Sequence, residues 1–197
     1  MLELQRRSAL DAHQTEHRAG GLLMRESALA VLGLRLVRGE PVGELEQRIG
    51  TALPVSINTA NAFGEGWIVG TEPNVWRVYA PMERHRALVQ AFADLAATAG
   101  LASDLSSRFC TLELTGPSAR QALASGCPLD LHPKVFEIGG AASSVLLGNA
   151  VLVVKTSGAP SFLLSCERAH ASVVWDWLAD AAQPASMLAA QDAGRAI

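Results

Sequence analysis

The chain has 197 residues, of which 49% are hydrophobic and 18% charged, and its formal net charge is −3. This length allows a substantial core in one large domain or two small ones, and the weak negative charge gives no electrostatic attraction to nucleic acid or anionic lipid. No apolar run reaches the roughly 20 residues of a membrane-spanning helix, and the N-terminus lacks the apolar core of a secretory signal. We therefore expect a cytoplasmic protein that binds neither nucleic acid nor membrane.

The chain begins with a polar, charged segment to about Gly21, and we predict residues 1–26 to be an N-terminal arm. His13 and His17 are four residues apart, a spacing that suits a metal site on a helix. No third ligand and no H-E-x-x-H order accompanies them. A solvated arm or a short helix, able to dock on a neighbouring subunit, is the preferred interpretation.

The next part, about residues 27–102, is predicted to contain strands and two helices. A long amphipathic helix is indicated because Leu88, Phe92 and Leu95 fall on one helical face. Small polar residues at 58–66 indicate a loop. The predicted elements are, in order, a strand at 28–36, a helix at 41–50, strands at 67–69 and 75–79, and a helix at 83–99.

The last part, about residues 103–183, repeats this plan. Cys110, Leu112 and Leu114 alternate with polar residues, as in a half-buried strand. Gly126 suits the left-handed position that ends a short helix. The predicted elements are a strand at 109–115, a helix at 117–125, strands at 142–147, 150–156 and 162–166, and a helix at 168–182.

A turn, a strand and a long helix thus occur twice, about 86 residues apart when Trp76 is aligned with Phe162. Such a repeat indicates two similar units rather than a solenoid. We predict an α+β fold of two ferredoxin-like split β-α-β halves, with mainly antiparallel sheet and helices outside. The halves form one domain over 27–183, and residues 184–197 form a C-terminal tail.

The search for catalytic residues centres on a stiff segment between two prolines. Cys127 is the candidate nucleophile and His132 the candidate base, but no oxyanion donor or orienting group accompanies them. Asp130 and His132 would share a side of an extended segment, as an orienter and a base do. We prefer a structural interpretation, in which Asp130 accepts backbone hydrogen bonds. Consequently, no catalytic, cofactor-binding or metal-binding residue is predicted.

A partner surface is predicted instead. Trp175 and Trp177 are two residues apart on a helix, so they cannot both face one core, and aromatic residues are enriched at interfaces. The low charged fraction also favours a surface partly covered by other proteins. The candidate interface residues are Pro128, Leu129, Asp130, Leu131, His132, Pro133 and Trp177.

Three stretches carry a resemblance to a known family: T-G-P-S-A-R at 115–120, G-C-P-L-D-L-H-P at 126–133 and V-W-D-W-L at 174–178. They resemble the gamma subunit of heterotetrameric sarcosine oxidase, a relative of the folate-binding glycine-cleavage T-protein fold. The resemblance covers about 103–182 firmly and 29–100 more loosely. It implies a pseudo-duplicated, T-protein-like domain.

The resemblance implies a non-catalytic structural subunit of a flavin-dependent oxidoreductase complex that acts on CH–NH donors. The complex would oxidatively demethylate or oxidise N-methyl or secondary amino acids in sarcosine catabolism. The implied partners are its alpha, beta and delta subunits. FAD, FMN, NAD and tetrahydrofolate are expected on these partners, and no cofactor is expected on this chain.

The alternative is a stand-alone folate-binding, T-protein-like protein of one-carbon transfer or repair. It would use the cleft between the halves, with Asp130 as the nearest candidate to hold the pterin. Such relatives carry a K-G-C-Y-x-G-Q-E string, whereas here Gly126 and Cys127 are followed by P-L-D-L-H-P. This difference argues against the alternative.

Overall fold

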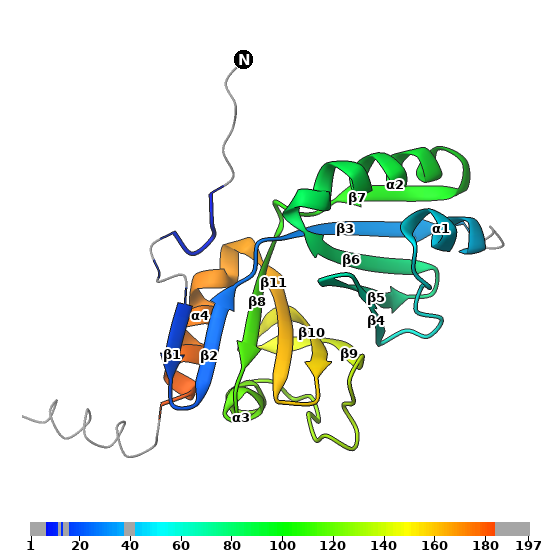
Figure 1. The fold of residues 1–197 in the computed structure, drawn as a ribbon. Helices are drawn as coiled ribbons and strands as arrows, with labels where there is room; N and C mark the ends of the chain where they lie inside the picture. Colours follow the sequence, from blue (N-terminus) through cyan, green and yellow to red (C-terminus); the bar gives the residue numbers. More distant parts are fainter. Residues whose placement is uncertain (1–6, 12, 14–15, 38–41, 184–197) are drawn as a thin grey trace, which may run out of the picture.

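Two antiparallel sheets form the centre of the molecule in the computed structural model, which describes residues 7–11, 13, 16–37 and 42–183 (Figure 1). The six-stranded sheet has the order β1-β2-β8-β11-β10-β9, and the five-stranded sheet has the order β4-β5-β6-β3-β7. Strands of the first sheet are β1 (Glu16–Ala19), β2 (Leu22–Glu26), β8 (Phe109–Thr115), β9 (Ala141–Leu146), β10 (Asn149–Ser157) and β11 (Ser161–Glu167). Strands of the second are β3 (Leu29–Leu36), β4 (Thr59–Phe63), β5 (Gly66–Glu72), β6 (Val75–Pro81) and β7 (Gly100–Asp104). The predicted α+β class is confirmed.

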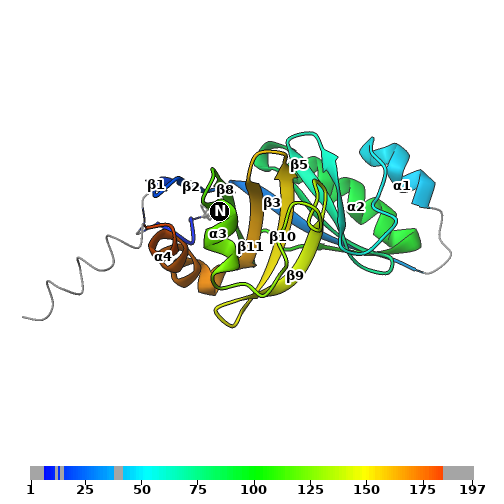
Figure 2. The same cartoon turned by 90° about the horizontal axis from the view of Figure 1, so that it is seen from below.

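Four helices cover the outer faces of the sheets. They are α1 (Val42–Ile49), α2 (His85–Ala99), α3 (Ala119–Ala124) and α4 (Ala171–Ala181). α1 and α2 pack on the five-stranded sheet, where Ile49, Leu88 and Phe92 join its core. α3 and α4 pack on the six-stranded sheet, where Leu123, Val174 and Leu178 do the same. The two helix pairs therefore lie at opposite ends of the molecule (Figure 2).

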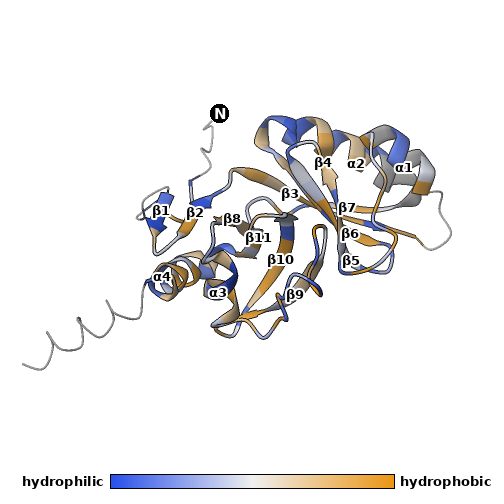
Figure 3. Cartoon of the chain, turned by 60° about the horizontal axis from the view of Figure 1, so that its bottom comes forward, coloured by the Kyte–Doolittle hydropathy of each residue, from blue (hydrophilic) through white to orange (hydrophobic). Residues whose placement is uncertain are grey.

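A third core joins the two sheets face to face. Val31, Val69 and Tyr79 of the five-stranded sheet meet Leu152 and Leu163 of the six-stranded sheet. Central strands such as β10 are buried on both faces and read as continuous apolar runs, A-V-L-V-V, rather than as an alternating pattern. The hydrophobic colouring of β3 and β10 in Figure 3 follows from this four-layer arrangement of helix, sheet, sheet and helix.

The two halves repeat each other with the expected period. β6, a 3₁₀ turn (Met82–Arg84) and α2 begin 86 residues before β11, a 3₁₀ turn (Arg168–His170) and α4. The sheet orders β4-β5-β6-β3 and β9-β10-β11-β8 correspond strand by strand. The repeat found in the sequence is thus a repeat of topology.

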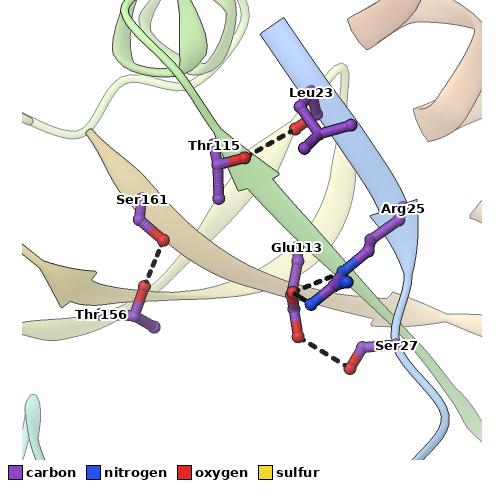
Figure 4. A network of polar contacts seen from close by, with 7 residues as sticks. All are labelled: Leu23, Arg25, Ser27, Glu113, Thr115, Thr156 and Ser161. Atoms are coloured by element: carbon purple, nitrogen blue, oxygen red, sulfur yellow. Dashed lines mark hydrogen bonds and ion pairs between the residues drawn. The ribbon is translucent and has the colours of Figure 1, made fainter. Parts of the chain in front are cut away.

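The N-terminal residues 16–26, which the sequence analysis assigned to an arm, form a hairpin on the second half. β2 pairs with β8, and Leu22 and Met24 are 1% and 0% exposed. Glu113 on β8 binds Arg25 at 2.6 Å and accepts a hydrogen bond from Ser27 at 3.0 Å (Figure 4). The hairpin was missed because its outer strand β1 alternates only between exposed and half-buried positions.

Two further strands differ from the expectations. The segment 58–66, predicted as a loop, contains β4, because Ala60 and Phe63 supply its buried positions among small polar residues. β7 was not predicted, because none of its five residues is fully buried and the segment therefore lacks a clear apolar pattern. The C-terminal tail, 184–197, lies outside the described residues. Within the described part of the chain, no helix has the length and apolar character needed to cross a membrane.

Met24→Ala tests whether the hairpin belongs to the domain. Met24 is fully buried against the six-stranded sheet, so we expect the free energy of unfolding to fall by roughly 2–5 kcal/mol in chemical denaturation. Arg18→Ala, at an exposed position of β1, is the control and should change it by less than about 0.5 kcal/mol. Equal stability of both variants would mean that these residues form a loose arm.

Candidate functional site

The candidate interface is built on a rigid turn after α3, residues 126–133, which we call the elbow. The N–H groups of Gly126 and Cys127 donate to the carbonyl of Leu123, at 3.2 and 2.9 Å, and end the helix. Further on, the Asp130 carboxylate accepts the N–H of His132 at 2.9 Å. His132 Nδ1 accepts the N–H of Lys134 at 3.3 Å. Asp130 therefore accepts a backbone hydrogen bond, as the structural interpretation predicted, and His132 accepts one as well.

The elbow residues divide between core and surface. Leu131 is 3% exposed and belongs to the core under the six-stranded sheet, so it holds the elbow in place rather than contacting a partner. Leu129 is half-buried, whereas Pro128, Asp130, His132 and Pro133 are exposed. The chain then continues with two exposed apolar side chains, Val135 and Ile138, at 64% and 60%.

Trp177 lies directly on the elbow. Trp175 is buried, but Trp177 is only half-buried, and a Cβ added at Gly126 would lie 2.5 Å from its ring carbon Cη2. Gly126 is not among the glycines with positive φ, so the predicted left-handed conformation was wrong. Glycine is needed here because the indole covers it. Sequence patterns do not indicate this contact, because the two residues belong to different elements.

All three cysteines are buried and free. Cys127 Sγ donates to Ser144 Oγ at 3.4 Å, and His132 Nδ1 accepts the N–H of Lys134, so the hydrogen bonds found for these two side chains do not join them as nucleophile and base. Cys110 and Cys166 face each other across β8 and β11. The hydrogen bond with Cys166, together with burial, raises the pKa of Cys110 above the ordinary thiol value. These cysteines act as small buried side chains.

The two histidines of the predicted arm have separate surroundings. His13 Nε2 lies 3.0 Å from Asp176 Oδ1 and its ring packs edge-on near Trp175. His17 lies on β1. Among the described residues, no group of three or more histidine, cysteine, aspartate or glutamate side chains is placed to hold a metal ion.

A pocket that the sequence analysis missed lies under the elbow. Lys155, on β10, is only 4% exposed, and its Nζ donates to the carbonyl of Ala159 at 2.8 Å and lies 4.6 Å from the centre of the Phe162 ring. Arg120, on α3, lines the same pocket. Burial, and then the positive charge of Arg120, lower the pKa of Lys155 below its ordinary value. The sequence indicates this pocket only through Lys155, a charged residue that directly follows the apolar run V-L-V-V of a buried strand.

A second cavity lies between the sheets, in the cleft that a folate-binding protein would use. It measures about 200 Å³ and is lined by Arg77, Ser143 and Ser165 among others. Ser165, whose hydroxyl is buried, belongs to this polar lining. Ligand clefts commonly measure roughly 300–1,000 Å³, so this cavity suits a few water molecules better than a pterin. Asp130 is not among its lining residues.

Gly126→Ala tests the contact between Trp177 and the elbow. The added methyl group would overlap the indole, so we expect a loss of about 1–3 kcal/mol in the free energy of unfolding. Trp177→Leu removes the obstacle, and the double variant should lose less than the sum of the single losses. Additive losses in denaturant unfolding would show that the two residues do not touch.

Lys155→Met tests the cost of the buried ammonium. Because the pKa of Lys155 is lowered, the folded protein binds fewer protons than the unfolded chain as pH approaches 10.5. Wild-type stability should therefore rise with pH in that range. The variant lacks this titration, so near neutral pH it should be no less stable than wild type, with a flatter pH profile. Lys134→Met, at an exposed position, should keep the wild-type slope. A large loss of stability in Lys155→Met would contradict this account.

Comparison with known structures supports the same fold. A chain of the "Heterotetrameric Sarcosine Oxidase from Corynebacterium sp. U-96 in complex with pyrrole 2-carboxylate" superposes with a TM-score of 0.79 at 26% identity, covering 90% of this chain and 94% of that one. The glycine cleavage system aminomethyltransferase T from Bartonella henselae gives a TM-score of 0.64 at 14% identity, covering 82% of this chain and 46% of that one. The second likeness concerns the fold alone.

Sequence comparison gives the family. A protein named sarcosine oxidase subunit gamma from Corynebacterium sp. (strain P-1) is 31% identical over 166 residues, covering 83% of this chain and 81% of that protein. Another of that name from Arthrobacter sp. is 33% identical over 141 residues, covering 70% and 69%. Residues 41–184 match the family described as "Sarcosine oxidase, gamma subunit family". The chain belongs to the sarcosine oxidase gamma subunit family.

Proposed function

We propose that this chain is a non-catalytic, structural subunit of a heterotetrameric, flavin-dependent complex that oxidises sarcosine or another N-methyl or secondary amino acid. The observation that carries the proposal is the match of 90% of the chain to one chain of a heterotetrameric sarcosine oxidase. The match covers 94% of that chain as well. We therefore propose that this chain also assembles with other subunits.

The proposed contact surface for the other subunits consists of the elbow, Trp177, and Val135 and Ile138 on the segment after the elbow. The surface combines exposed prolines with Val135 and Ile138, which are exposed apolar side chains on a segment held by hydrogen bonds. A half-buried tryptophan beside it adds an aromatic group of the kind enriched at protein interfaces. A rigid surface also loses little conformational entropy on docking.

The proposal assigns the chemistry to the partners. The alpha, beta and delta subunits would hold FAD, FMN, NAD and tetrahydrofolate, and the complex would act in sarcosine catabolism in the cytoplasm. On this chain, the carboxylate of Asp130 and the Nδ1 atom of His132 are engaged with backbone N–H groups. This arrangement supports a docking role for the elbow.

Purification of the tagged chain from its own host tests the proposal. We expect a yellow complex with flavin absorbance, in which mass spectrometry identifies flavoprotein partners in fixed stoichiometry. A colourless single chain that binds tetrahydrofolate would overturn the proposal in favour of the folate-binding alternative. A colourless chain without folate affinity would overturn both.

The double variant Val135→Asp/Ile138→Asp tests the proposed surface. Both side chains are exposed, so the unfolding temperature should stay the same, whereas recovery of the partners should fall at least tenfold, roughly 1.4 kcal/mol or more. The matched control is Val55→Asp, at a fully exposed apolar position outside the elbow, which should retain the partners. Equal recovery from both variants would place the interface elsewhere.

A further inference from the structure

Two cationic side chains converge in the pocket beneath the elbow. The pocket measures about 440 Å³ and is lined by Arg120, Pro133, Phe136, Glu137, Ile138, Lys155 and Gly158. Lys155 lies on the face of β10 that carries Val153, directly opposite Phe162 of β11. Arg120 reaches the pocket from α3, and Pro133 and Phe136 close it from the elbow side. The pocket is therefore assembled from three separate segments of the chain.

Neither cation has an anionic partner in the described part of the chain. None of the ion pairs found there involves Lys155 or Arg120. Glu137 lines the pocket, yet its side chain is exposed and forms no ion pair with either of them. Arg120 Nε is buried without a hydrogen-bond partner. A buried ammonium beside a second positive charge is costly unless an anion neutralises it.

The free donors define what the pocket accepts. An ammonium group carries three N–H donors, and among the described residues Lys155 Nζ uses one of them on the carbonyl of Ala159. Arg120 adds its unpaired Nε–H. The other walls include the apolar side chains of Pro133, Phe136 and Ile138. Two cationic donors with an apolar wall suit an organic carboxylate, because charge-assisted hydrogen bonds hold its oxygens while its carbon atoms contact the wall.

We propose that this pocket is a carboxylate-binding site in which Lys155 and Arg120 hold the anionic group. The carboxylate comes either from a free organic acid or from an acidic residue of a subunit docked on the elbow. The pocket is formed by this chain alone, so the proposal does not depend on the proposed function. It also extends that function, because Pro133 belongs both to the proposed contact surface and to the pocket wall.

Thermal unfolding of the isolated chain tests the free-acid source. Sodium butyrate is compared with sodium chloride at equal ionic strength and pH. We expect butyrate to raise the unfolding temperature by a few degrees in a saturable manner, as a ligand bound to the folded state does. Lys155→Met and Arg120→Gln should lose this response, whereas Lys134→Met should keep it. An equal response in all four proteins would count against the site.

Carbodiimide cross-linking of the purified complex tests the subunit source. The reagent activates a carboxyl group, and attack by a lysine amine forms an amide and releases the urea. The chain has only two lysines, Lys134 and Lys155, so mass spectrometry distinguishes them. An amide between Lys155 and a partner's acidic residue supports the proposal. Two results together overturn it: Lys155 forms no amide, or one only with Glu137 of the same chain, and butyrate gives no response. Partner recovery is read separately, so loss of this site and failure of the proposed assembly are distinguishable.

Discussion

The packing of the two sheets against each other is the constraint on which the rest of the structure depends. Their inner faces are filled by side chains such as Val31, Tyr79 and Leu163, so the helices have only the outer faces to cover. Burial on both sides explains why the central strands are so apolar. It also fits the low share of charged residues, 18% of the chain, because the two inner faces and the helix-covered outer faces leave few positions in contact with water.

The elbow comes after the shortest of the four α-helices in the described residues. α3 has six residues, two fewer than α1, its counterpart in the other half. The elbow follows α3 directly, with Cys127 and Leu131 in the core, and the residues between these two are exposed or half-buried. A segment that is anchored by its own core residues and exposed between them is a suitable docking surface, because it is ordered before a partner arrives.

The pocket with Lys155 and Arg120 lies beside the elbow, because Pro133 is part of its wall. It would bind a partner by electrostatic attraction rather than by apolar contact. The apolar residues at the elbow provide contact area, whereas the pocket provides positive charge that forms no ion pair within the described residues. Uncompensated buried charge reduces the stability of an isolated chain. Such a group is better explained by a ligand than by folding, and its position under the proposed interface connects the two features.

The sequence by itself determined the local elements, the 86-residue repeat and the family, because apolar periodicity, turn residues and short motifs are properties of neighbouring positions. It also predicted that Asp130 accepts a backbone hydrogen bond. The tertiary structure alone decided that β2 joins the second half, that Gly126 lies under Trp177 and that Lys155 meets Arg120. These contacts join distant segments and depend on which strands pair, and periodicity specifies the faces of a strand but not its neighbours.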